Sequence, residues 1–546
     1  MESIGIVFVM FLAVIASGAV VRMLPVAVPL PLVQIGLGAL IAGAFHRGVQ
    51  MEPDLFFFLF LPPLLFLDGW RIPKDGLLRD KGTIVQLAIG LVVFTVVGLG
   101  FFIHALVPSM PLAVAFALAA IVSPTDPVAV SAITERVAMP RRVMHILEGE
   151  SLLNDASGLV AFRFAVAAAV TGSFSASSAA LSFVWVSVAG LAVGWGFTRL
   201  VAGAKALFSR RYGEEPGAEI LLSLLIPFGA YAAAEQVHAS GILAAVAAGI
   251  TMSYVELRGT VLAVTRVQRT AVWNTVQFTL NGVMFVLLGE QLPAILHGAV
   301  RVVEQSGHAN PWWLLGYALA INLALAALRF AWVWMSLQIS RRLAVARGHQ
   351  PPKPERKLTL AVSLAGVRGA ITLAGVLTLP VTLGDGSPFP ARDLAIFLAA
   401  TVIIASLVIA SVSLPRLLLN LEIPPETQRH AQEDLALRAS REAAAQAIER
   451  TLHDLVDAHP DADPKLYTEV ASRLMEAMAQ QAAGGVDRDA DADMVQRQEA
   501  VAAEMRLAAL RASRDELFRL ARAREISDEV CREAVRKIDL QEARGR

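Results

Sequence analysis

The chain has 546 residues, of which 55% are hydrophobic and only 17% are charged. A soluble protein of this length would carry about a quarter charged residues, so most of the chain is expected to face lipid. Its 47 basic and 47 acidic residues cancel, and the sequence has neither a basic stripe nor a zinc pattern, which argues against nucleic acid as a partner. The single cysteine, Cys531, excludes an intramolecular disulfide and thiolate metal clusters, and we interpret it as a half-buried helical residue.

Charge is distributed unevenly along the chain. Long apolar runs separated by short polar loops extend to about residue 421, whereas residues 422–546 are rich in charge. We therefore predict a transmembrane domain over residues 1–421 and a helical cytoplasmic tail over residues 422–546, with breaks at 459–464 and 483–487. The N-terminus lacks the basic region of a secretory signal and is interpreted as the first membrane helix, not a cleaved leader.

About thirteen stretches are long and apolar enough to cross a bilayer, which takes roughly 20 residues as a helix. The expected spans are 4–22, 27–45, 55–70, 83–107, 111–134, 143–171, 177–203, 218–236, 239–254, 271–296, 311–340, 358–383 and 392–419. Loops on one side hold about twenty Lys and Arg residues and loops on the other side only Arg47, Arg301 and Arg392. Because positive residues accumulate in cytoplasmic loops, the N-terminus is expected in the periplasm and the tail in the cytoplasm.

Charged side chains inside membrane spans are costly and usually functional. Arg163 lies about 12 Å along its helix from Asp155, and we expect it to be structural. The full set is Asp126, Glu150, Asp155, Arg163, Arg329 and Arg368, with Asp68 and Glu290 nearer to span ends. Glu290 is expected at the outer interface, or less favourably on an access path, and His104 and His238 are expected as solvated histidines near outer span ends.

Two spans are expected to be interrupted. Two prolines in Ser123-Pro124-Thr125-Asp126-Pro127 remove backbone donors and clash with preceding carbonyls, which prevents a continuous helix. Gly366-Val367-Arg368-Gly369-Ala370 places two glycines beside an arginine at a similar depth in the second half of the chain. Such a pair is typical of a transporter site built from crossing half-helices, where Asp126 would face exposed helix N-termini and Arg368 exposed carbonyls. The alternative is two kinked packing helices with snorkelling charges.

The sixth span carries Glu150-Ser151-Leu152-Leu153-Asn154-Asp155. Helical spacing puts Glu150 with Asn154 on one face and Ser151 with Asp155 on the adjacent face. An ionised carboxylate in low dielectric is unfavourable unless a proton or a cation neutralises it, so we expect Asp155 to exchange one for the other. A structural ion pair is the alternative for Asp155, and pairing with Arg329 is the favoured interpretation for Glu150.

In this order and at these depths, the three motifs resemble the monovalent cation:proton antiporters of the electroneutral Na+/H+ exchanger branch, most closely bacterial inner-membrane members with a long cytoplasmic tail. The resemblance implies an all-α polytopic membrane protein with about thirteen transmembrane helices in inverted repeats, a homodimer, and an elevator-like motion of a core domain against a dimerisation domain. It also implies Na+ at Asp155 and Asp126, surrounded by Asn154, Thr125 and Ser151, with a Glu150–Arg329 pair and Arg368 supporting the helix crossing.

Two positions refine this resemblance. Asn154 stands where the electrogenic branch has a second aspartate, which implies one proton per cation. Many relatives carry an acid after the paired prolines of the third span, whereas this chain reads Leu64-Leu65-Phe66-Leu67-Asp68. Whether Asp68 takes the equivalent position is left open by the sequence.

We therefore expect a transporter, not an enzyme, that exchanges Na+, or Li+ or K+, for H+ across the bacterial inner membrane for pH and sodium homeostasis, without a cofactor. K+/H+ exchange at the same site is the alternative, because selectivity depends on cavity size and ligand geometry. A cation channel gives no reason for a titratable carboxylate at the crossing. An intramembrane enzyme is disfavoured, since the sequence has no His-Glu-x-x-His and no second aspartate in a Gly-Asp motif.

Overall fold

The structure is a computed structural model, and the part of the chain it describes is almost entirely helical. Within that part, the one isolated β-bridge joins Thr382 and Pro388. The predicted domain boundary at residues 421/422 lies outside the described residues, as do the tail break at 483–487 and all but the last residue of the break at 459–464. The described residues are 2–25, 28–45, 53–127, 130–131, 139–172, 176–257, 261–305, 312–346, 356–383, 387–419, 427–458, 464–480 and 492–544.

Each predicted span overlaps at least one described helix, although 111–134 and 358–383 are described as helix only in part. Seven helical stretches are long and apolar enough by themselves to cross a membrane. They lie in the run α5 (Lys81–Val85), η1 (Gln86–Leu91) and α6 (Val92–Leu106), and in α9 (Arg141–Thr171), α10 (Ala176–Tyr212), α11 (Pro216–Gln236), α13 (Ala263–Gln305), α14 (Trp312–Ala346) and α17 (Arg392–Leu418). Shorter or less apolar helices are α1 (Glu2–Met23), α2 (Leu30–Phe45), α3 (Pro53–Arg71), α4 (Lys74–Arg79), α7 (Leu112–Val122) and α12 (Gly241–Glu256).

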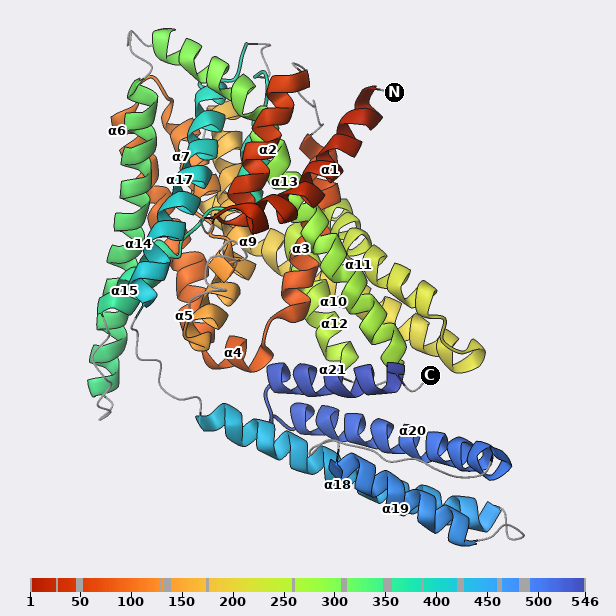
Figure 1. Cartoon of the computed structure of the whole chain (residues 1–546). Helices are drawn as coiled ribbons and strands as arrows, with labels where there is room; N and C mark the ends of the chain where they lie inside the picture. Colours follow the sequence, from red (N-terminus) through yellow and green to blue (C-terminus); the bar gives the residue numbers. More distant parts are fainter. Residues whose placement is uncertain are drawn as a thin grey trace.

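The membrane helices pack as two groups (Figure 1). The first helix group comprises α1, α2, α3 and α10 to α13, and the second comprises α5 to α7, α9 and α14 to α17. Close packing within the first group depends on glycine: a methyl group on Gly249 of α12 would overlap the carbonyl of Phe66, and one on Gly289 of α13 would overlap the carbonyl of Ile35. Helix backbones can approach this closely in a membrane only where small residues lie between them.

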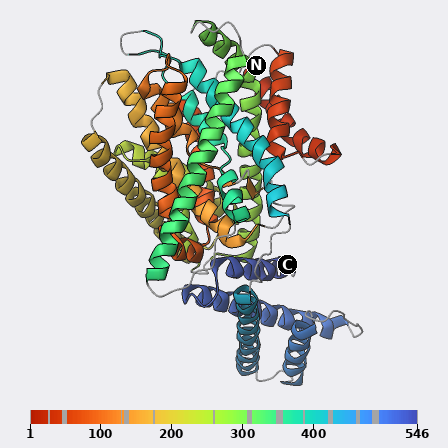
Figure 2. The ribbon, with the colours of Figure 1, turned by 90° about the vertical axis from the view of Figure 1, so that its left-hand side faces the viewer.

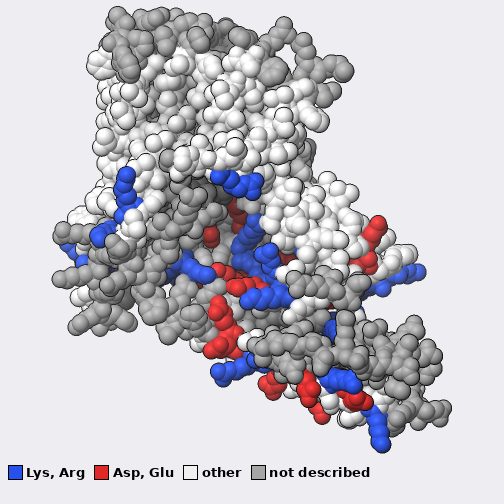
Figure 3. All heavy atoms as spheres, viewed as in Figure 1, with Lys and Arg blue, Asp and Glu red and all other residues white. Residues whose placement is uncertain are grey.

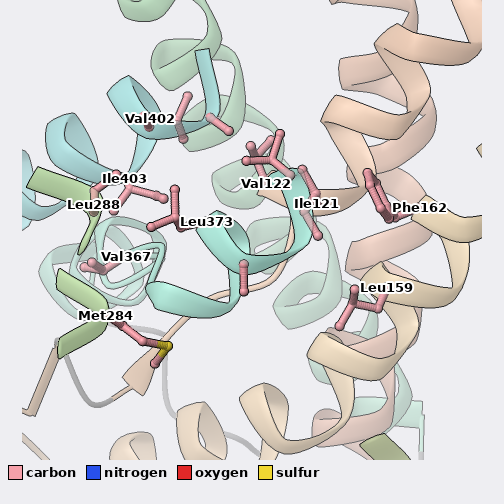
Figure 4. Close-up of a cluster of buried hydrophobic side chains, with 14 of the residues drawn as sticks. Ile121, Val122, Leu159, Phe162, Met284, Leu288, Val367, Leu373, Val402 and Ile403 are labelled. Carbon is pink, nitrogen blue, oxygen red and sulfur yellow. The ribbon is translucent and has the colours of Figure 1, made fainter. Parts of the chain in front are cut away.

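Apolar side chains fill the centre of the second helix group and its contact with α13 (Figure 4). The C-terminal end of α7 and the middle of α9 meet α16 and α17 there, so the interrupted segments are anchored in a packed core. The labelled side chains are Ile121, Val122, Leu159, Phe162, Met284, Leu288, Val367, Leu373, Val402 and Ile403.

Two helices of the second group stop where the sequence predicted interruptions. Helix α7 ends at Val122, and residues 123–126 are irregular because Pro124 and Pro127 cannot continue the hydrogen-bond ladder. Helix α15 (Arg356–Leu364) is followed by irregular residues 365–369 before α16 (Ala370–Leu377) begins. The interruptions leave free helix ends beside α9, which carries Asp155.

Four tail helices lie at one end of the bundle, opposite the end where the N-terminus lies (Figure 1). They are α18 (Thr427–Ala458), α19 (Pro464–Gln480), α20 (Ala492–Arg522) and α21 (Asp528–Arg544). Helix α21 lies directly against the membrane helices, with α20, α18 and α19 beyond it (Figures 1 and 2). Cys531 is 1% exposed among α18, α20 and α21, so it is fully buried where the sequence predicted half-burial, because α21 is covered on two sides.

The described surface is also divided into an uncharged membrane part and a charged tail end. On the face in Figure 3, charged side chains gather at the tail end of the membrane helices and on the tail, while the described upper part is almost free of charge. An uncharged belt is what a lipid-facing surface requires, since a charge in hydrocarbon is costly.

Candidate functional site

The irregular segments of the two interrupted helices lie against each other, and Arg368 binds carbonyl groups of both. The backbone N–H of Asp126 donates to the carbonyl of Val367 at 2.7 Å, so the two irregular segments are directly joined. Arg368 Nε donates to the carbonyl of Val122 at 3.0 Å, and Nη1 donates to the carbonyl of Gly366. Its positive charge therefore lies at the carbonyl end of α7, where the helix dipole is negative.

Asp126 lies at the beginning of the other half-helix. Gly369 immediately precedes α16, and a Cβ atom at Gly369 would overlap the Asp126 carboxylate. Only glycine permits this approach. The carboxylate consequently lies at the N-terminal end of α16, where free N–H groups carry partial positive charge.

Glu150 and Arg329 form a buried, two-pronged ion pair. Arg329 donates from Nη1 to Glu150 Oε1 at 2.6 Å and from Nη2 to Oε2 at 2.8 Å, and their side chains are 1% and 3% exposed. The Thr125 hydroxyl donates to Glu150 Oε1 at 3.2 Å, and Asn154 Nδ2 donates to Thr125 Oγ1 at 3.1 Å. The pair thus neutralises both charges and anchors a chain of polar groups that ends at Asn154.

A cavity of ≈ 40 Å³ lies between the two helix groups beside this network. That volume is enough for a water molecule or a small dehydrated ion. Three carboxylates and no Lys or Arg belong to its lining. Its lining residues are Leu64, Asp68, Pro124, Thr125, Asp126, Ser151, Asp155, Gln277, Asn281, Met284, Gly369, Ile371 and Thr372.

The structure brings four of the predicted ion-site residues to this cavity: Thr125, Asp126, Ser151 and Asp155. Within the described part of the chain, no hydrogen bond or ion pair joins the Asp155 carboxylate to another side chain. Asn154 is not part of the lining, because its amide turns to Thr125. Its Oδ1 atom is buried without a hydrogen-bond partner among the described residues.

Three polar residues on the opposite wall extend the predicted set. Asp68 of α3, whose equivalence the sequence left open, lines the cavity. Gln277 and Asn281 of α13 also line it, and sequence reasoning missed them. The available signal was the spacing of these two amides, one helical turn apart in the predicted span 271–296, which places them on one face. Through these three side chains, the first helix group contributes polar groups to the side of the cavity opposite Asp155.

The residues that the sequence analysis discounted lie outside the cavity lining. Arg163 has a 57% exposed side chain, 3.8 Å from Glu235, and His104 Nδ1 lies 2.9 Å from the Met110 carbonyl. His238 is exposed. Glu290 is only 3% exposed, because this part of α13 packs closely against α2.

Comparisons with known proteins agree with this architecture. Residues 7–420 match the family described as sodium/hydrogen exchanger, transmembrane. The chain is 41% identical to the Na+/H+ exchanger YjcE of Escherichia coli, over 100% of this chain and 99% of that protein. It is 45% identical to a sodium, potassium, lithium and rubidium/H+ antiporter of Bacillus pumilus, over 74% of this chain but 60% of that protein.

A solved structure shares the fold. The sodium proton antiporter MjNhaP1 of Methanocaldococcus jannaschii superimposes with a TM-score of 0.58, covering 77% of this chain and 99% of that one. The two sequences are 19% identical, so the likeness concerns the fold alone.

Proposed function

Since the chain belongs to the sodium/hydrogen exchanger family of transmembrane antiporters, we propose that it exchanges one Na+ for one H+ at Asp155, across the bacterial inner membrane. The observation that carries this proposal is the cavity lining, with its three carboxylates and no basic residue. Such a lining attracts a cation. The basic residues of the crossing are engaged elsewhere, Arg329 by Glu150 and Arg368 by helix carbonyls.

Exchange follows from the shared site. The Asp155 carboxylate faces the cavity without a protein cation beside it, and its charge needs a neutralising partner in low dielectric. A proton on a carboxylate oxygen meets that need. A Na+ ion held by the same oxygen and by the hydroxyls of Thr125 and Ser151 also meets it, since hard cations prefer oxygen ligands. The two occupants exclude each other, which couples their movements one for one.

Alternating access is proposed to come from motion between the helix groups. The cavity has walls from both groups, with Asp155 on the second and Asp68 on the first. Relative sliding would therefore open it toward either side in turn. We further propose a homodimer with the N-terminus in the periplasm and the tail in the cytoplasm, as the loop charges favour, and a role in pH and sodium homeostasis without enzymatic activity.

A second candidate substrate is K+. The Bacillus pumilus relative is named for potassium, lithium and rubidium as well as sodium. The amide side chain of Asn281 lines the present cavity beside its carboxylates, and a neutral amide oxygen is compatible with several alkali cations. K+/H+ exchange would use the same residues and the same coupling.

The test is coupled transport by purified protein in liposomes with an imposed pH gradient, using Na+, Li+ and K+ in turn. Wild type should move protons only when a cation moves the other way. Lowering the pH should raise the Michaelis constant for Na+ and leave the maximal rate nearly unchanged, because proton and cation compete for Asp155. A channel would pass cation without coupled protons.

Asp155→Asn keeps the size of the side chain but removes its titratable charge, so it should abolish both coupled fluxes. Asp393→Asn is the matched control, because the Asp393 side chain is 50% exposed at the start of α17 and is absent from the cavity lining. If folded Asp155→Asn still drives Na+-dependent proton movement above empty liposomes, the single-site proposal is wrong. Asp126 and then Asp68 would be the carboxylates to examine next.

A further inference from the structure

A large second cavity lies under the tail. Its volume is ≈ 590 Å³, and its lining includes Arg71, Lys74, Asn274 and Asp528. Helix α21 forms one wall and the tail-side ends of α3, α12 and α13 form the other. We call this space the vestibule.

Ion pairs hold α21 in place over the vestibule. Lys74 Nζ lies 3.4 Å from Asp528, and Arg141 of α9 lies 2.8 Å from Glu529. Toward the other end of α21, Asp539 accepts two hydrogen bonds from Arg266 of α13, at 2.6 and 2.7 Å. Helix α21 therefore contacts both helix groups, and the vestibule is a defined part of the tail-side surface.

Arg71 lies between the vestibule and the Asp155 cavity. It is the last residue of α3, and its guanidinium spans two amides of α13. Nη1 donates to Gln277 Oε1 at 2.7 Å, and Nη2 donates to Asn274 Oδ1 at 2.6 Å. Asn274 lines the vestibule, whereas Gln277 lines the Asp155 cavity. The guanidinium thus binds one residue from the lining of each cavity.

The amides form a stripe that continues to the ion site. Asn274, Gln277 and Asn281 are three and four residues apart, so they share one face of α13. The stripe is roughly 10 Å long at the helical rise. Asn281 at its inner end lines the Asp155 cavity, and its side chain has no hydrogen-bond partner among the described residues. Amide oxygens in a line can accept a partly dehydrated cation in successive steps.

We propose that Arg71 is the gate on the tail-side path of the cation. On this path the cation enters the vestibule first, passes Arg71, and follows the amide stripe to Asp155. This inference rests on the proposed exchange function. In the closed arrangement the guanidinium repels an approaching cation and occupies the carbonyl oxygens of Asn274 and Gln277. Passage requires it to release those oxygens and move into the space of the vestibule.

The experiment measures the Michaelis constant for Na+ separately from the tail side and from the opposite side, in oriented vesicles. Arg71→Gln removes the charge and keeps a polar side chain, so the constant should fall severalfold on the tail side and stay unchanged on the other. Arg71→Lys keeps the charge and should remain closer to wild type. The control is Arg210→Gln, which removes an exposed charge near the end of α10 and should change neither side.

A gate acts on one side only, whereas loss of a structural link between α3 and α13 would impair both sides equally. Equal changes on the two sides, or wild-type constants for Arg71→Gln on both, would overturn the gate. If wild type itself shows no coupled flux, the exchange proposal fails first, so the two failures are distinguishable.

A second measurement keeps the proposal testable if Arg71→Gln does not fold. Asn274→Ala releases one anchor of the guanidinium without altering Arg71, and it should also lower the tail-side constant. In addition, a cysteine at Asn281, in a Cys531→Ala background, should react with a small cationic methanethiosulfonate from the tail side faster when Asn274 is alanine. An unchanged labelling rate together with an unchanged transport constant would contradict the gate.

Discussion

Breaking the Glu150–Arg329 pair should destabilise the membrane domain, and the two single mutants should differ. Both side chains are almost fully buried and share two charge-assisted hydrogen bonds. Removing one partner of such a pair typically costs about 3–5 kcal/mol, because it leaves an uncompensated buried charge. Glu150→Ala leaves a guanidinium that cannot lose its charge, and among the described residues only the Val362 carbonyl then accepts a hydrogen bond from it, at Nε. Arg329→Ala leaves a carboxyl group that can take up a proton.

We therefore expect Glu150→Ala to lose more stability than Arg329→Ala, and only the Arg329→Ala loss to shrink as the pH is lowered. The assay is the fraction of monodisperse protein after heating in detergent, read by size-exclusion chromatography at two pH values. Arg163→Ala removes an arginine from the same helix as Glu150, but an exposed one, and should match wild type. The charge swap Glu150→Arg with Arg329→Glu should recover part of the loss.

The result that refutes this reasoning is specific. If Glu150→Ala folds and melts like wild type but abolishes transport, the carboxylate of Glu150 belongs to the ion site and not to the scaffold. The distinction is clear because transport and melting are measured on the same purified sample.

Three further predictions concern packing, topology and the tail. Gly289→Ala should lower the melting temperature, because a methyl group there overlaps the α2 backbone, whereas Gly36→Ala meets nothing within 4 Å and should not. Impermeant thiol reagents added outside should label a cysteine at Thr171 and spare one at Ser209; the reverse pattern contradicts the proposed orientation. Burial raises the pKa of the Cys531 thiol from 9.0 to about 12, so its thiolate, the reactive form, is about a thousandfold scarcer at neutral pH. Maleimide should modify it slowly until denaturant frees the tail, and rapid modification of native protein would contradict the docked position.

The interrupted helices were predictable because their cause is local. Pro124 and Pro127 remove two backbone donors within four residues and clash with preceding carbonyls, which favours a break at this point. Gly369 is different: its necessity comes from the Asp126 carboxylate beside it, which belongs to a segment more than 200 residues away in sequence. The sequence could indicate a break at Gly366–Gly369 but not which side chain occupies the space a Cβ would need.

The wall opposite Asp155 could not be derived from the sequence. Periodicity places Gln277 and Asn281 on one face of α13, but it does not say whether that face meets lipid, another helix or a cavity. The direction of the Asp68 side chain is equally hard to predict from sequence, because it depends on how α3 packs against α12. The contacts of α21 are even harder to predict, since ion pairs such as Arg266–Asp539 join segments that no local sequence pattern relates.

For Asn154, helical spacing and the family resemblance predict different roles. Helical spacing groups Asn154 with Glu150 and apart from Asp155, and the structure follows that grouping: its amide binds Thr125, which binds Glu150. The resemblance placed Asn154 in the ion-binding set instead. Both statements are compatible if Asn154 acts through Thr125, whose position at the cavity is fixed by this chain of hydrogen bonds. The amide then shapes the ion site from behind, and the charge that the cation meets remains that of Asp155.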